Sequence, residues 1–166
     1  VFEDVSRAEI TSSIFEVNRA GEDGGAILIE GNASVVVSSS IFTSNEATFS
    51  EGGGIMVQDG ARLMVSNTAF QRNFAPNRGG HVLCQQEARA VFERSKFIEG
   101  VGGGVSLEGN CEANFTECDF EANVIDELGG AMLVGDSTFA SLIGCKFTRN
   151  AALSGGAISA TDAALV

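Results

Sequence analysis

The sequence predicts an all-β fold: a right-handed, single-stranded parallel β-helix (solenoid) of about six coils, each with 23–28 residues and three short strands. Two observations carry this prediction. A pair of glycines recurs six times, and a phenylalanine lies 18 residues after the first glycine of the first five pairs. Between these markers apolar residues alternate with smaller or polar ones, which is typical of strands with one buried face. The glycine pairs are Gly24-Gly25, Gly52-Gly53, Gly79-Gly80, Gly102-Gly103, Gly129-Gly130 and Gly155-Gly156.

The coil that starts at Gly24 illustrates the elements in order. A first strand buries Ile27 and Ile29, and a polar corner at 30–32 ends it, because Gly and Asn tolerate positive φ. A second strand buries Val35 and Val37. A third strand runs from Ser40 to Phe42, and a loop of variable length leads to the next glycine pair.

Two columns of identical residues should hold the coils together. Stacked rings about 4.8 Å apart are expected for Phe15, Phe42, Phe70, Phe97, Phe120 and Phe147. A ladder of side-chain amides along the axis is expected for Asn18, Asn45, Asn73, Asn123 and Asn150. In the fourth coil Gly100 replaces the Asn and the loop is cut to almost nothing, so the ladder should be interrupted there. The other loops should lie on one face, which is often the binding face of repeat proteins.

Residues 1–166 are interpreted as one β-helix segment that is cut in mid-coil at both ends, because neither end carries a cap. Its expected partners are further coils of the same protein. The net charge of −12 argues against nucleic acid as a partner, since phosphates require Lys and Arg. No apolar run approaches the ~20 residues of a membrane helix, so this segment is not expected to insert into a membrane. No cofactor is expected.

Two short motifs stand out once the repeats are aligned. GGAI occurs at 24–27 and 155–158, and FxxN occurs five times, first at 15–18. This combination resembles the repeat of the chlamydial polymorphic outer membrane proteins and of large eukaryotic surface proteins with similar repeats. The resemblance covers essentially the whole chain. It implies an extracellular or cell-surface β-helix with a structural or adhesive role, and it carries over no catalytic residues.

The four cysteines offer two possible disulfides. Cys118 and Cys145 occupy the same inward position of adjacent coils, about 5 Å apart, and this pair is favoured in the oxidising environment that an exported protein meets. The alternative is two buried free thiols. Cys84 and Cys111 lie near one corner but four positions out of register, so they form the second, less favoured pair. No cysteine or histidine spacing indicates a metal site.

His81 is the only histidine, which excludes a Ser-His-Asp triad and a two-histidine metal site. It replaces the Ala or Gly of other coils, and we interpret it as a side chain tolerated at a turn-to-strand junction rather than a general base. On the outward face Lys96, Asp119 and Lys146 should stack, either as an axial ion-pair ladder or as a sugar-cleaving cluster.

Exposed corners carry the remaining candidates. The corner acids either form a solvated edge, which we favour, or attract Ca²⁺; they are Asp4, Glu30, Asp59, Glu108, Asp136 and Asp162. Two sequons begin at Asn32 and Asn114; both asparagines should face outward, and they are candidate glycan sites if the source is a eukaryote, with chance occurrence of the motif as the alternative.

Two hypotheses for function follow. The first is a non-catalytic extracellular module that builds a rod, filament or surface-display stalk and contacts other surface proteins or glycans. The second is the scaffold of a polysaccharide lyase or hydrolase of the pectate-lyase type, acting through the face of Lys96 to Lys146 or through a site outside this segment.

Overall fold

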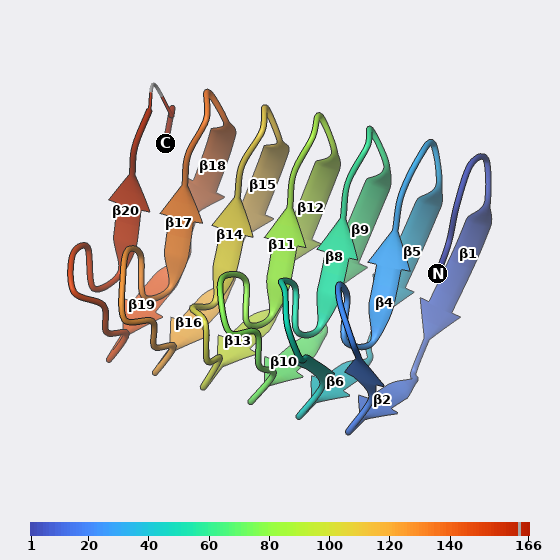
Figure 1. Ribbon diagram of the computed structural model, residues 1–166, viewed down its shortest axis with the longest axis horizontal. Coiled ribbons are helices and arrows are strands. Elements are labelled where there is room, and N and C mark those ends of the chain that lie inside the picture. Colours follow the sequence, from blue (N-terminus) through green and yellow to red (C-terminus); the bar gives the residue numbers. More distant parts are fainter. Residues whose placement is uncertain (163) are drawn as a thin grey trace.

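Three parallel sheets of six strands each wrap around one core in the computed structural model, which describes residues 1–162 and 164–166 (Figure 1). The first sheet contains β1 (Arg7–Thr11), β5 (Ser34–Ser38), β9 (Arg62–Ser66), β12 (Arg89–Glu93), β15 (Glu112–Thr116) and β18 (Phe139–Ile143). The second contains β2 (Ile14–Glu16), β6 (Ile41–Thr43), β10 (Ala69–Gln71), β13 (Lys96–Ile98), β16 (Asp119–Glu121) and β19 (Lys146–Thr148). The third contains β4 (Ile27–Ile29), β8 (Ile55–Val57), β11 (Val82–Cys84), β14 (Val105–Leu107), β17 (Met132–Val134) and β20 (Ile158–Ala160). A short pair, β3 (Arg19–Ala20) and β7 (Glu46–Ala47), joins the first two loops.

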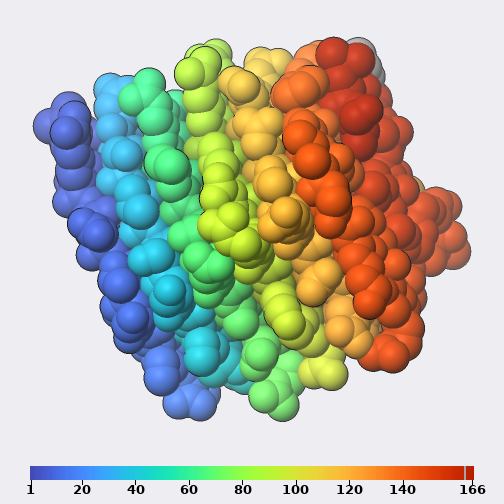
Figure 2. All heavy atoms as spheres, turned by 180° about the vertical axis from the view of Figure 1, so that it is seen from behind, coloured from blue at the N-terminus to red at the C-terminus, as the bar shows by residue number. Residues whose placement is uncertain are grey.

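The chain advances one coil at a time from one end of the solenoid to the other. Seen as spheres from behind, the coils form successive bands, each beside its neighbours in the sequence (Figure 2). The predicted solenoid of about six coils with three strands each is therefore confirmed, and every interstrand pair is parallel and joins equivalent positions of adjacent coils.

The phenylalanine column is confirmed in full. Phe15, Phe42, Phe70, Phe97, Phe120 and Phe147 pair in register along the second sheet. Their ring centroids lie 4.5 to 5.1 Å apart with interplanar angles of 3° to 15°. A second, shorter stack of Phe92 on Phe115 meets this column edge-on, with Phe92 and Phe97 at 72°. The aromatic core thus continues without a break through the irregular fourth coil.

Left-handed residues bend the chain on both sides of each third strand. Around β6 these residues are Ser39 (φ 49°) and Ser44 (φ 54°), and equivalent residues in the other coils share the conformation. Ser40, predicted to open the third strand, lies instead inside the bend. Its hydroxyl donates to Ser38 O at 2.8 Å and accepts the N–H of Ser13 at 3.1 Å. This column of small polar residues therefore closes the corner and does not extend the sheet.

Candidate functional site

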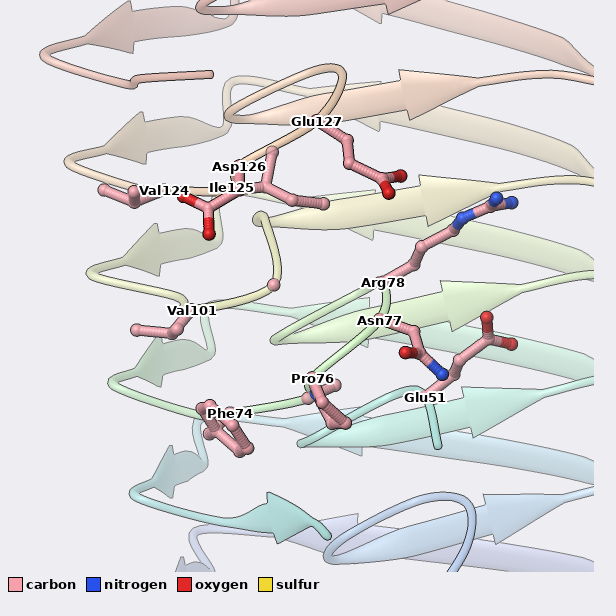
Figure 3. A pocket seen from close by; sticks show the side chains of 12 residues that line it. Glu51, Phe74, Pro76, Asn77, Arg78, Val101, Val124, Ile125, Asp126 and Glu127 are labelled. Carbon is pink, nitrogen blue, oxygen red and sulfur yellow. The ribbon is translucent and has the colours of Figure 1, made fainter. Parts of the chain in front are cut away.

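The candidate site is a cleft of about 660 Å³ that lies where the fourth coil has lost its loop (Figure 3). The loops at 74–78 and 124–128 border it on two sides. Between them a single residue, Val101, connects Gly100 to Gly102, where other coils use four to six residues. The cleft is lined by Glu51, Phe74, Ala75, Pro76, Asn77, Arg78, Val101, Gly102, Val124, Ile125, Asp126 and Glu127.

Glycine makes the short connection possible. Gly102 has φ of 88°, and a Cβ there would lie 2.0 Å from the carbonyl oxygen of Ala75, so a side chain at this position is excluded. Val101 nevertheless keeps the coil register, because it bridges to Phe74 on one side and to Val124 on the other. The backbone stack is therefore continuous beneath the cleft, and only the overhanging part of the loop is missing.

The cleft has one apolar wall and one charged wall. Phe74, Val101 and Val124 stack along one side with 37%, 48% and 45% of their surfaces exposed. Arg78 and Glu127 extend from the opposite side, with Glu51 below them (Figure 3). A bound molecule would therefore contact apolar and ionic groups together.

Negative charge exceeds positive charge at this wall. Arg78 is already paired, because its Nη1 donates to Glu108 Oε1 at 2.7 Å, and this contact raises the pKa of Arg78. The pKa of Glu51 is also raised, chiefly by burial and next by the neighbouring Glu108 carboxylate. Glu51 and Glu127 have no ion-pair partner within the described residues. The field of the cleft thus favours a cationic group.

A histidine completes the amide ladder beneath the cleft. Asn73 Nδ2 lies 3.0 Å from His81 Nδ1, and His81 Nε2 lies 3.0 Å from Asn123 Oδ1. On one side of the imidazole, Asn18 donates to Asn45 at 2.8 Å and Asn45 donates to Asn73 at 2.9 Å. On the other side, Asn123 donates to Asn150 at 2.9 Å. The predicted interruption at Gly100 is therefore wrong: the imidazole takes the place of the missing amide.

Gly100 is small because His81 occupies its space. A Cβ at Gly100 would lie 2.8 Å from His81 Nε2 and 2.7 Å from the carbonyl oxygen of Gly103. The interpretation of His81 as a side chain merely tolerated at a junction is also wrong, since it is fully buried and bonded at both ring nitrogens. Sequence reasoning overlooked this residue, although the one histidine and the one departure from the Asn column fall in the same coil.

The ladder fixes the protonation state of His81. Asn73 Nδ2 also donates to Phe42 O at 3.0 Å, and Asn123 Oδ1 accepts the N–H of Gly100 at 2.9 Å, so both amide orientations are determined. His81 therefore accepts at Nδ1 and donates from Nε2–H as a neutral ring. Burial lowers its pKa from 6.5 to about 3, and the bonds to Asn123 and Ile98 oppose this only partly.

The structure reverses the order of preference for the disulfides. Cys84 and Cys111 are bonded, with their Cα atoms 6.0 Å apart, because the polar turn between strand and corner brings these inward positions face to face. The favoured pair, Cys118 with Cys145, is wrong: both are free. Each thiol donates to the carbonyl two residues earlier, as the hydroxyls of the neighbouring Ser column do: Cys118 to Thr116 O at 3.5 Å and Cys145 to Ile143 O at 3.7 Å. Burial raises the pKa of Cys118 to about 11, so it stays a thiol.

Comparison with known proteins agrees with this geometry. A family model described as right-handed beta helix region matches residues 1–164. The chain belongs to the right-handed β-helix family. No curated protein matches the sequence significantly. In the part of the chain that the structure describes, no helix is long and apolar enough to cross a membrane.

The outward face of the β-helix stacks Lys96, Asp119 and Lys146 in register, as predicted. The ion-pair ladder expected between them is wrong, since no pair within 4.0 Å joins these three among the described residues; axial pairs such as Arg89 with Glu112 (3.3 Å) form elsewhere. Among residues 1–162 and 164–166, no group of three or more acidic, His or Cys side chains is arranged to hold a metal ion.

The corners and sequons of the β-helix have distinct environments. Glu30 accepts from Gln58 at 3.1 Å, and Gln58 accepts from Gln85 at 3.0 Å, so this edge forms a short ladder, while Glu108 at the equivalent position of the next coil pairs with Arg78. Asn32 is exposed at its corner, while Asn114 is half-buried in β15 between Val91 and Ser141. Glycan attachment at either asparagine stays a prediction.

Proposed function

We propose that this β-helix is a non-catalytic extracellular module that serves as a stiff rod or surface-display stalk. The observation that carries the proposal is the continuity of its axial ladders. The Phe stack runs through all six coils. His81 connects the two halves of the amide ladder in the fourth coil, where Gly100 replaces the Asn. Retaining both columns through an irregular coil favours a role in which the chain resists bending.

Two further features support display outside the cell. The Cys84–Cys111 bond joins the fourth and fifth coils, and disulfides persist in oxidising compartments. The GGAI and FxxN motifs resemble the polymorphic outer membrane protein type of repeat, whose members are displayed at surfaces. We therefore propose that the module lies at the cell surface, with other surface proteins or glycans as its contacts.

Labelling of intact source cells tests this proposal. An antibody raised against the purified chain should stain unpermeabilised cells, and external protease should remove the signal. Staining that requires permeabilisation would contradict surface display. A cytoplasmic protein of the same cells, probed in parallel, controls for leakage.

The second candidate function is the scaffold of a polysaccharide-active enzyme. Its support is the in-register column of Lys96, Asp119 and Lys146 on one outward face. Incubation with acidic and neutral polysaccharides, with and without Ca²⁺, should release no new reducing ends if the first proposal holds. Turnover that disappears in Asp119→Asn would favour the enzyme instead.

A further inference from the structure

We infer that the cleft over the fourth coil is a docking site for an extended peptide segment of a partner protein that presents a basic side chain beside apolar ones. This inference goes beyond the proposed structural role, because a stiff rod does not require an occupied cleft. Three properties of the cleft carry it: its width, an unpaired backbone donor on its rim, and its surplus of carboxylates.

The width suits a single extended chain. Adjacent coils lie about 4.8 Å apart, so the loops of the third and fifth coils, at 74–78 and 124–128, are separated by about two such steps. The one loop that would fill the interval is absent because Val101 replaces it. An extended segment has the thickness of that missing loop and enters the gap with ordinary strand spacing on both sides.

The rim offers a backbone donor to such a segment. In the regular second coil, Thr48 N–H donates to Ala20 O of the preceding loop at 3.0 Å. The equivalent donor on the cleft rim is the N–H of Asp126, and the loop that would accept it is missing. Within the described residues this N–H has no hydrogen-bond acceptor, while the preceding N–H of Ile125 bonds Ala151 O at 3.1 Å. Such an unpaired N–H can bond a backbone carbonyl oxygen of an added extended segment, as the unpaired groups of a sheet edge do.

The charges select a basic side chain. Glu51, Asp126 and Glu127 face the cleft, and the one cation, Arg78, is already held by Glu108. A Lys or Arg side chain can lay its aliphatic stem on an apolar surface and keep its charged head near carboxylates. The wall of Phe74, Val101 and Val124 provides that surface, and Phe74 adds an aromatic face for the cation.

Fluorescence anisotropy with a labelled octapeptide of alternating Lys and Val, capped at both ends, tests the inference on the full chain. We expect saturable binding that is at least tenfold tighter than for the matched Glu–Val peptide. The double variant Glu51→Gln/Glu127→Gln should weaken binding about fivefold or more. Glu9→Gln/Glu16→Gln removes the same charge from exposed positions of the first coil and should leave binding unchanged. Equal weakening by both double variants would overturn the site.

A loop insertion tests the shape of the site. Four residues inserted between Val101 and Gly102 restore a loop of regular length, and surface loops tolerate such additions. The insertion should abolish peptide binding while the thermal midpoint and the circular dichroism spectrum stay close to those of the parent. Unchanged affinity would overturn docking in the cleft. Spermidine that competes as strongly as the peptide would also overturn it, since charge alone would then explain the binding.

Discussion

The fourth coil and its regular neighbours continue the same axial hydrogen-bond ladder with different residues. In a regular step one Asn amide donates to the next, as Asn45 does to Asn73 at 2.9 Å, and a loop of about five residues overhangs the joint. In the fourth coil Gly100 removes the amide, His81 replaces it from a different position, and the loop shrinks to Val101. The difference shows that the ladder constrains donors and acceptors at each level, not the residue that supplies them.

His81→Ala should break the fourth coil most severely. It removes a fully buried ring, leaves one of the two amide N–H groups of Asn73 without an acceptor, and leaves the carbonyl oxygen of Asn123 with only the N–H of Gly100. A cavity and an unpaired buried N–H together predict a loss of about 3–5 kcal/mol in the free energy of unfolding. Urea denaturation followed by circular dichroism measures it. A loss under about 1 kcal/mol would show that the His81 hydrogen bonds in the amide ladder contribute little to stability.

The same substitution provides a double-mutant cycle. Gly100→Asn alone forces a side chain into the space of His81 and against the carbonyl oxygen of Gly103. Combined with His81→Ala it recreates the pattern of a regular coil, so the double variant should lose less stability than the two single losses added together. Strict additivity would argue against compensation between the two positions. Ala131→Gly in the sixth coil, where the residue equivalent to His81 is small, should show no coupling to Gly100→Asn.

The disulfide should give the next largest effect. The Cys84–Cys111 bond joins the irregular fourth coil to the regular fifth coil and spans 27 residues. The chain-entropy model gives about 3.5 kcal/mol for a closed loop of this length. Cys84→Ala/Cys111→Ala should therefore lower the free energy of unfolding by about that amount, in the absence of reductant. Cys118→Ser, which keeps a small donor in the Ser column, should change far less, and a larger loss there would contradict the assignment of Cys118 as an unpaired thiol.

Acid should weaken the fourth coil through His81. Its pKa is lowered from 6.5 to about 3 in the folded state, so the unfolded chain binds a proton first as the pH falls. Stability is therefore lost progressively from about pH 6.5 down to about pH 3, amounting to roughly 2 kcal/mol at pH 5. Burial is the cause of the lowered pKa, because a charged ring would lose its hydration; protonation would in addition set Nδ1–H against the donor of Asn73.

The variant His81→Gln does not titrate in this pH range, so it isolates the contribution of His81 to the pH dependence of stability. The raised pKa of Glu51 acts in the opposite direction, because it stabilises the folded chain as the pH falls, but it is common to both proteins. The difference in unfolding free energy between parent and variant should change by about 2 kcal/mol from pH 7 to pH 5. A constant difference would mean that His81 titrates normally.

The repeat allowed the coils, the register and both columns to be predicted, because identical residues at a fixed spacing must stack. It did not predict His81, since positions before the first strand and after the third become neighbours only once the coil is closed. It misjudged the cysteines for a related reason. Equal positions stack their side chains in parallel, as Cys118 and Cys145 do, whereas Cys84 and Cys111 face each other across a corner. The cleft arose from a shortening visible in the sequence, but its charged wall comes from loops whose paths the repeat leaves open.

Glycine substitutions at the corner after the third strand should show whether the backbone of the fourth coil is regular at that corner. Glu99 in that coil and Ala122 in the next have φ of 55° and 54°, a left-handed conformation that costs a residue with a Cβ about 1 kcal/mol or more. Replacement by Gly removes this strain but frees the unfolded chain, so Glu99→Gly and Ala122→Gly should each stabilise by a few tenths of a kcal/mol. Ala69→Gly, within β10, should destabilise by about 0.5–1 kcal/mol. Equal gains at Glu99 and Ala122 in urea denaturation would show that the irregularity is confined to the loop and the ladder; a gain at Ala122 alone would extend it to the corner.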